Sequence, residues 1–514
     1  MISRNSRAAL LTASGVCALI VLDTNIVAVT LPRIARDLHA TFVDIEWVVS
    51  AYMLTFAAGL LPAGSVADRF GRKRMLLIGL GIFMLASLGC GLASTSLQLN
   101  LARAIKGLGA ALLLTSALAT IAHAFHNERE RAGAWAFWGA CLGAAMLMAP
   151  SLGGIISQTI GWRWVFLLNL PIGLFLGIMV IRNITESKDT GAARLDFWGC
   201  LFFGGSLSLL TWALIDANRI GWGATITLLR LTGGALLLLL FIVAERLQQR
   251  PMIDLSLFRN GRFLCALLGM AAYAGCAQVM MTLIPLYLQI SLRFSAIAAG
   301  AGMLPFALTM LLFPRIGMRL SARLNASSML ALGLVLVGIG NLLSAWASTT
   351  PSYLPFALAI AITGSGAGLL NGDTQKNIMA CVPHARSGMA SGISTTTRFA
   401  SIVLAFGLLG GLLAHRTQSL FEYALGENAD THGLSARIIP HVIAGDLSGA
   451  MAGLSEAMHA VLEPLARTSF AGGFSWILGI AGVVALLSAL VIYLFMKDNA
   501  TLAAPNVASE HLSR

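Results

Sequence analysis

The chain contains a succession of apolar runs, each long enough to cross a lipid bilayer. A membrane-spanning helix needs about 20 predominantly apolar residues, and fourteen such runs follow one another along the 514 residues. We predict spans at residues 9–32, 46–66, 75–94, 97–122, 134–158, 164–182, 197–216, 226–244, 264–285, 297–316, 328–346, 353–375, 389–413 and 474–496. Only 11% of the residues are charged, whereas soluble domains carry about 25%. The sequence therefore predicts an all-α polytopic membrane protein.

The positions of the basic residues predict the orientation. Lys and Arg are enriched in cytoplasmic loops. With a cytoplasmic N-terminus, the inside segments hold 22 of the 34 basic residues and the outside segments hold nine. The other three lie within spans: Arg103, Lys106 and Arg398. We thus expect a multi-pass protein of the cytoplasmic (inner) membrane with both termini in the cytoplasm. The net charge of +12 is then a topology signal, and no nucleic-acid partner is predicted.

Two polar connections, 183–196 and 245–263, enclose a pair of helices between two larger sets. The predicted division is an N-terminal six-helix bundle (1–183), an inserted helix pair (184–247), C-terminal bundle helices (248–413), an external loop (414–472), and a last helix with a cytoplasmic tail (473–514). An internal echo supports two related halves. GSVADRFGRKR (Gly64–Arg74) and GMRLSAR (Gly317–Arg323) occupy corresponding loops, and transporters often build binding sites from such repeats.

Four regions of the chain carry a recognisable pattern. GSVADRFGRKR resembles the loop signature of the major facilitator superfamily, and LNLARAIKGLGAA (Leu99–Ala111) resembles its fourth-helix signature. GACLGAAMLMAPSLGG (Gly139–Gly154) resembles the fifth-helix antiporter signature. LDTNIVAVTLP (Leu22–Pro32) and WRWVFLLNLPIG (Trp162–Gly173) look like the fourteen-helix drug:proton antiporter branch.

This resemblance implies a fold of two six-helix bundles plus two inserted helices. It also implies proton-driven multidrug efflux of small organic compounds by alternating access, with the proton as coupling ion and no other cofactor. We expect a monomer whose partners are the lipid bilayer and a small-molecule substrate. Three positions depart from the pattern: Lys106 stands where Gln is usual, Ala149 replaces the Gly before Pro150, and Ser321 stands where the second copy of the loop signature has lost its Asp.

Asp23 is the first candidate for proton coupling. An ionised Asp at the centre of a membrane helix costs about 2.5–3.5 kcal/mol, and burial disfavours the charged form of a carboxyl. Such a group can gain and lose a proton as water reaches it from either side. Arg103 lies at a similar depth and can form an ion pair that alternates with protonation. The alternatives are an aspartate paired permanently for packing, and an Arg103 that binds backbone carbonyls of the first helix.

Three further charged residues have open roles. Asp373 is a second proton-coupling candidate, although Lys376, three residues later, can pair with it structurally. Arg398 can bind an anionic substrate group or satisfy Asp373. Glu46, near the outer mouth of the second span, is expected to be a solvated interfacial charge, with proton entry as the alternative.

The loop after the second span is predicted to be a conformational gate. Gly64 and Gly71 allow turns and close approach, and Asp68 can cap a helix or pair with arginine. Arg69 and Arg72 can meet lipid headgroups or helix ends. Simple topology anchoring is the alternative.

The fifth span is rich in small residues, which allow close helix packing in lipid. Gly139, Gly143, Gly153 and Gly154 are the candidates for such packing, and Pro150 can kink the helix. The functional interpretation is a bend that seals the two bundles against each other. Plain close packing is the alternative.

A substrate cavity is predicted weakly from aromatic and polar residues. Trp47, Tyr52 and Trp138 can stack flat or cationic compounds, and Asn25 and Arg398 join them as polar candidates. Tryptophans near helix ends also serve as interface anchors. No clustered His, Cys or carboxylate set is apparent, so no catalytic or metal site is predicted.

Two rival functions remain at this stage. A metabolite uniporter or importer would share the fold, and the fifth-helix pattern argues against it. A membrane enzyme or receptor would need a reactive cluster, or ligand binding without translocation.

Overall fold

The computed structural model describes residues 4–125, 128–188, 196–248, 253, 255–321, 323–382, 387–426 and 429–496. Within these ranges, fourteen helices are long and apolar enough to cross a membrane, and no strand occurs. The predicted fold class is therefore confirmed. The predicted tail (497–514) and residues 189–195 of the first polar connection lie outside the described ranges.

The N-terminal half contains six spans, and the first of them is interrupted. α1 (Arg4–Ile26) is followed by a 3-10 turn (Ala28–Thr30) and by the short α2 (Leu31–Leu38). The other helices are α3 (Phe42–Phe70), α4 (Arg72–Leu92), α5 (Ser96–Ala124), α6 (Glu128–Thr159), α7 (Arg163–Leu167) and α8 (Asn169–Asn183). α3 begins with a capping box, in which Thr41 and Asp44 satisfy each other's backbone N–H groups.

The inserted pair consists of α9 (Phe197–Ile220) and α10 (Thr225–Leu247). Asp196 caps α9 by accepting a hydrogen bond from the Gly199 N–H at 2.8 Å. α9 packs against both α3 and α17 (Ser387–Leu425). The pair therefore contacts both halves.

The C-terminal half begins with a 3-10 turn (Leu255–Arg259) and α11 (Gly261–Tyr273). A π-helical turn (Ala274–Gln278) then joins α11 to α12 (Val279–Ile290). The remaining spans are α13 (Ala296–Gly302) with α14 (Leu304–Leu320), α15 (Ala326–Ala347), α16 (Tyr353–Ala380), α17, and α20 (Glu456–Phe495). π-turns within helices occur frequently at functional sites, and this one positions Gln278.

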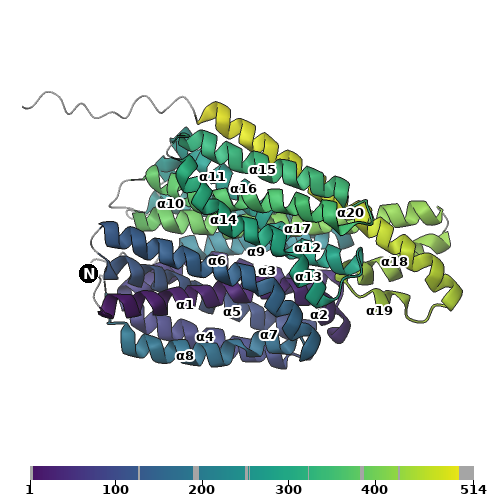
Figure 1. Cartoon of the computed structure of the whole chain (residues 1–514), viewed down its shortest axis with the longest axis horizontal. Helices are drawn as coiled ribbons and strands as arrows, with labels where there is room; N and C mark the ends of the chain where they lie inside the picture. The colour runs from purple at the N-terminus through teal and green to yellow at the C-terminus, as the bar shows by residue number, and fades with distance from the viewer. Residues whose placement is uncertain are drawn as a thin grey trace, which may run out of the picture.

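The predicted external loop, 414–472, is wrong in its secondary structure. α17 continues to Leu425, α18 (Ala429–Ala444) and α19 (Leu447–Met451) follow, and α20 begins at Glu456. In α18, Ile438, Ile439, Val442 and Ile443 are 0–2% exposed. Their helical spacing forms an apolar face, which explains the helix despite the polar composition of the segment. Figure 1 shows these helices projecting beyond one end of the bundle.

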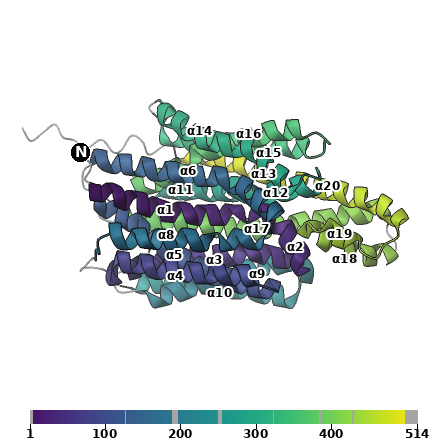
Figure 2. The ribbon, with the colours of Figure 1, turned by 60° about the horizontal axis from the view of Figure 1, so that its bottom comes forward.

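The two halves lie side by side, with α1, α4, α5, α7 and α8 below α11, α14, α15 and α16 in the view of Figure 1. α1 begins and α20 ends at the same end of the bundle. α2, α18 and α19 lie at the opposite end in both views (Figure 2).

Candidate functional site

Asp23 lies on α1 in the core of the N-terminal half and is fully buried. Its Oδ1 accepts hydrogen bonds from Lys106 Nζ and, at 2.7 Å, from Asn169 Nδ2. Its Oδ2 accepts a hydrogen bond from Arg103 Nη1 at 3.2 Å. Asp23, Arg103, Lys106 and Asn169 are termed the Asp23 cluster below. The cluster joins α1, α5 and α8 through one carboxylate.

Aromatic rings enclose both cations of the cluster. The Arg103 guanidinium carbon lies 4.3 Å from the centroid of the Tyr52 ring. Lys106 Nζ lies 4.7 Å from the centroid of Phe83 and 5.1 Å from that of Phe166. All three rings are 0% exposed. Cation–π contacts are stronger when water is excluded, so these rings help to hold two buried cations.

The sequence of α5 explains why the cluster forms. Arg103 and Lys106 are three residues apart and therefore share one helix face. Gly107 lets α5 approach α3 so closely that an added Cβ would lie 2.3 Å from the Tyr52 carbonyl oxygen. Thr55 Oγ1 donates to the Ala104 carbonyl oxygen at 2.7 Å and fastens the same contact. Asn169 is the first residue of α8, where the chain restarts its helix after α7.

With its ionisable groups charged, the cluster holds one carboxylate and two cations and has a net charge of +1. Buried charges are costly unless they are paired and hydrogen-bonded, and here each charged group has a partner. Strongly interacting groups exchange protons as a unit. The arrangement can therefore couple the binding or release of one proton to a change in helix contacts.

The structure brings two predicted proton-coupling residues together and leaves the third apart. Asp23 and Arg103 form an ion pair. The predicted alternative for Arg103 was a hydrogen bond to backbone carbonyls of the first helix. Its Nε does donate to a backbone carbonyl, but to that of Val48 on α3, at 2.8 Å. Asp373 lies on α16 in the other half and is partly buried. Lys376 interacts with it electrostatically, without an ion pair within 4.0 Å in the described part of the chain.

Arg398 belongs to a separate polar network in the C-terminal half. Its Nε donates to Gln278 Oε1 at 2.7 Å, and its guanidinium carbon lies 5.5 Å from the centroid of Tyr273. The Tyr273 hydroxyl donates to Asn371 Oδ1 at 3.1 Å. In this conformation Arg398 therefore bonds Gln278 of the π-turn and not Asp373.

The predicted gating loop is fastened to the connection that follows α8. Glu186 accepts hydrogen bonds from the Lys73 N–H at 3.0 Å and the Arg74 N–H at 3.1 Å. Asp68 pairs with Arg72 at 2.9 Å, which decides between its two predicted roles. Arg69 is exposed. The first turn of α4 is thus capped by a carboxylate more than 100 residues away.

The two glycines of the loop behave differently, and the difference makes a testable pair. Gly71 has φ +109°, and a Cβ there would lie 2.7 Å from the Glu186 carboxylate. Gly64 has no heavy atom within 4 Å of an added Cβ. We expect Gly71→Ala to destabilise the protein by about 1–3 kcal/mol, because a non-glycine residue is strained in that conformation. Gly64→Ala should be neutral or slightly stabilising. Thermal unfolding in detergent measures both, and equal effects would contradict the assignment.

Most of the predicted close-packing residues of the fifth span face another helix. An added Cβ at Gly153 would lie 2.6 Å from the Ile26 carbonyl oxygen of α1, and one at Gly154 would lie 2.3 Å from the Ala296 carbonyl oxygen of α13. Gly143 faces Leu311 of α14. Pro150 lies inside α6, with its carbonyl oxygen against Gly300 of α13. Gly139 faces open space. The halves therefore meet closely toward the α2 end of α6 and not around Gly139.

The predicted substrate residues do not form one group. Tyr52 is fully buried and belongs to the wall of the Asp23 cluster. Trp47 meets Trp212 of the inserted pair edge-on at 6.1 Å, and Trp138 meets Trp135 at 5.5 Å. Asn25 Nδ2 donates to the Val21 carbonyl oxygen one turn earlier at 2.7 Å.

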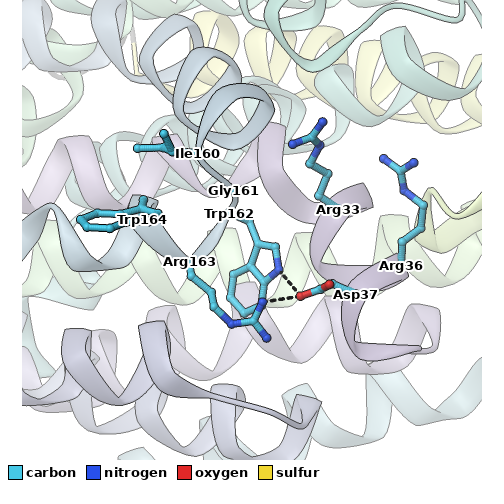
Figure 3. Close-up of a pocket in the computed structure, with 8 residues that line it drawn as sticks. All are labelled: Arg33, Arg36, Asp37, Ile160, Gly161, Trp162, Arg163 and Trp164. Atoms are coloured by element: carbon cyan, nitrogen blue, oxygen red, sulfur yellow. Dashed lines mark hydrogen bonds and ion pairs between the residues drawn. The ribbon is translucent and has the colours of Figure 1, made fainter.

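A surface pocket of about 490 Å³ lies where α2 meets α7, and Figure 3 shows its lining. Asp37 accepts hydrogen bonds from Trp162 Nε1 at 2.9 Å and from Arg163. Arg33 and Arg36 add positive charge to the same pocket (Figure 3). They also line a neighbouring pocket of about 640 Å³ between the halves. Neither pocket includes a residue of the Asp23 cluster, so both are surface features of the α2 end.

Sequence reasoning missed four residues that hold these contacts. Lys106 appeared as a basic residue within a span and as a departure from a pattern, and its spacing from Arg103 could have indicated a shared partner. Asn169 lies in the quoted WRWVFLLNLPIG stretch, where nothing points to Asp23, and Gln278 carries no local signal that separates it from other polar residues. Glu186 lies in a polar connection, where nothing in the sequence points to α4.

The Major Facilitator Superfamily model matches residues 13–406. The chain is 33% identical over 397 residues to the Multidrug resistance protein Stp of Mycobacterium tuberculosis (strain CDC 1551 / Oshkosh), which covers 77% of this chain and 74% of that protein. It is 28% identical over 507 residues to the Tetracenomycin C resistance and export protein of Streptomyces glaucescens, covering 95% and 91% of the two chains.

Among solved structures, the fold is similar to that of a bacterial homologue of the human lysosomal transporter Spinster in an inward-facing, occupied conformation. The TM-score is 0.64 and the identity 17%, with 96% of this chain and 97% of that chain covered. At this identity the likeness concerns the fold alone. The matched family model, the fourteen apolar helices and the two-half architecture agree, and the chain belongs to the Major Facilitator Superfamily as a multi-pass membrane protein.

Proposed function

We propose that the protein exports small organic compounds of the drug and toxic-metabolite class, and that proton entry drives this export. The observation that carries the coupling mechanism is the buried Asp23 cluster, in which a carboxylate and two cations lie sealed inside one half. The names of the relatives, a multidrug resistance protein and an antibiotic export protein, support the substrate class. The exporter works as a monomer in the cytoplasmic membrane, with both termini in the cytoplasm, and no nucleic acid takes part.

The Asp23 cluster differs from a single buried acid that exchanges a proton with water. Because Asp23 bonds two cations, the exchangeable proton belongs to the cluster as a whole. Rocking of the halves admits water to the cluster from one side at a time. Binding of one proton by the carboxylate raises the net charge of the cluster from +1 to +2, and this change weakens the contacts among α1, α5 and α8. Protonation is thereby linked to which side is open.

The proton gradient supplies enough free energy for useful export. One proton moving down a potential of about 100 mV releases about 2.3 kcal/mol. At about 1.4 kcal/mol per tenfold change, this supports a substrate gradient of roughly fifty-fold. This value applies to an uncharged substrate, because exchange of one proton for one cation moves no net charge across the membrane.

Transport by the purified protein in liposomes tests the proposal. An imposed pH gradient should drive a fluorescent drug such as ethidium against its concentration gradient. Because protons move in exchange, the pH of the liposome lumen should change at the same time. A proton ionophore should abolish accumulation without preventing equilibration. Accumulation that is unaffected by the ionophore would exclude proton coupling for this substrate.

The same assay separates the rival function. A uniporter equilibrates its substrate and moves no proton. An importer accumulates it inside energised right-side-out vesicles. Because Ala149 replaces the usual glycine before Pro150 in the antiporter pattern, both controls belong in the first experiment.

A further inference from the structure

Glu46 is a second buried carboxyl group, outside the Asp23 cluster. It lies on α3, one helical turn past Phe42, and is 1% exposed. Within the described part of the chain, its Oε1 has no hydrogen-bond partner. That oxygen points at Gly410 of α17, where an added Cβ would lie only 2.0 Å away. The expectation of a solvated interfacial charge at Glu46 is therefore wrong.

Asp216, on the inserted pair, interacts with Glu46 but already has a cation of its own as a partner. Asp216 of α9 accepts hydrogen bonds from Arg230 Nη1 at 2.6 Å and Trp212 Nε1 at 2.9 Å. It also interacts electrostatically with Glu46, and a charged Asp216 would have the same sign as a charged Glu46. Trp47, beside Glu46 in sequence, packs edge-on against Trp212 and covers this region.

The other described charged groups on helices packed against α3 leave Glu46 without a counter-charge. They are Arg103, Lys106 and His123 on α5; Arg398, His415, Arg416 and Glu422 on α17; Arg437 and His441 on α18; Arg33, Arg36 and Asp37 on α2; and Arg72, Lys73 and Arg74 on α4. In the described structure, none of them forms a hydrogen bond or an ion pair with Glu46. An unpaired buried carboxylate costs far more free energy than a buried neutral acid.

We propose that Glu46 is a second proton-binding site, which holds its proton in this conformation and exchanges it with water when α3, α9 and α17 separate. This inference rests on the proposed proton-coupled function. The three helices belong to the N-terminal half, the inserted pair and the C-terminal half. Any rocking of the halves must therefore change the surroundings of Glu46.

The position of Glu46 along α3 favours uptake of its proton from the aqueous phase at the α2 end, which is the outer side when both termini are cytoplasmic. Four residues separate it from Phe42, the first residue of α3, which corresponds to about 6 Å of helix rise. When α17 moves away, Gly410 no longer covers Oε1 and water can reach it. Asp216 disfavours a negative charge on Glu46 only while α9 is packed against α3. The inserted pair therefore takes part in the coupling.

Infrared spectroscopy of the protein in lipid films tests the protonation directly. The wild type should show a carboxylic-acid carbonyl stretch at neutral pH that is absent in Glu46→Gln. This variant keeps the shape of the neutral acid, so the closed conformation is retained. Glu456→Gln, the same change at an exposed position, should leave the band intact. A band that is unchanged in Glu46→Gln would overturn the proposal.

Counting protons per substrate in proteoliposomes tests the exchange. Glu46→Gln should move one proton fewer per substrate than the wild type while still transporting under a steep gradient. An unchanged non-zero ratio would show that Glu46 never releases its proton. If the wild type moves no protons with substrate, the proposed function fails instead, and the infrared result still decides whether Glu46 carries a proton.

Discussion

Replacing Asp23 by Asn should abolish proton-coupled efflux and also weaken the fold. The carboxylate is the shared acceptor for Arg103, Lys106 and Asn169, and its loss leaves two buried cations unpaired. Removing one partner of a buried ion pair typically costs about 3–5 kcal/mol. We therefore expect a lower unfolding temperature in detergent and no substrate accumulation driven by a pH gradient.

A charge-balanced variant separates the loss of folding from the loss of coupling. Asp23→Asn raises the net charge of the cluster from +1 to +2, and adding Lys106→Gln returns it to +1. The double variant should regain much of the lost stability and yet fail to accumulate substrate, because it has no carboxylate for the proton or the guanidinium. Lys106→Gln alone, which installs the residue usual in the family pattern, measures the contribution of the second cation. Coupled transport by the double variant would refute the role proposed for Asp23.

Much of the fold could be predicted because lipid imposes a simple rule. Runs of about 20 apolar residues must be helices that span the bilayer, so the fourteen spans followed from composition alone. The segment around α18 shows the limit of this rule. Its helix is short and amphipathic, with Ile438 and Val442 on one buried face, and a search for long apolar runs does not detect such a pattern.

The candidate site was predictable only in part, for a physical reason. A charge inside a membrane span is conspicuous, so Asp23 and Arg103 were identified and correctly expected to be close enough to pair. Of the partners that complete the site, Lys106 is a further charge on the helix of Arg103, which the sequence did not link to Asp23, and Asn169 is an ordinary polar residue on a distant helix. Glu46 illustrates the opposite error, since its place near a helix start suggested solvent and the packing of α17 removes that solvent.

Gly154→Ala should block transport by opening the contact between the halves. The Cβ of alanine would fall 2.3 Å from the Ala296 carbonyl oxygen, and neither α6 nor α13 can yield without moving its backbone. Overpacking of this kind costs about 1–3 kcal/mol, which corresponds to roughly a 5- to 150-fold shift in a conformational equilibrium. We expect at least a tenfold fall in substrate accumulation in proteoliposomes. Gly300→Ala, which would push a Cβ to 2.4 Å from the Pro150 carbonyl oxygen, should have the same effect from the opposite helix.

The matched control for this prediction is Gly81→Ala on α4, where no heavy atom lies within 4 Å of an added Cβ. Spin labels on Thr159 of α6 and Leu354 of α16, both exposed and clear of the contact, report the separation of the halves. Because the new methyl group acts as a wedge, Gly154→Ala should lengthen the distance between the labels, and Gly81→Ala should leave it unchanged. A transport defect with an unaltered distance would mean that Gly154 acts within its own half and not as part of a seal between the two.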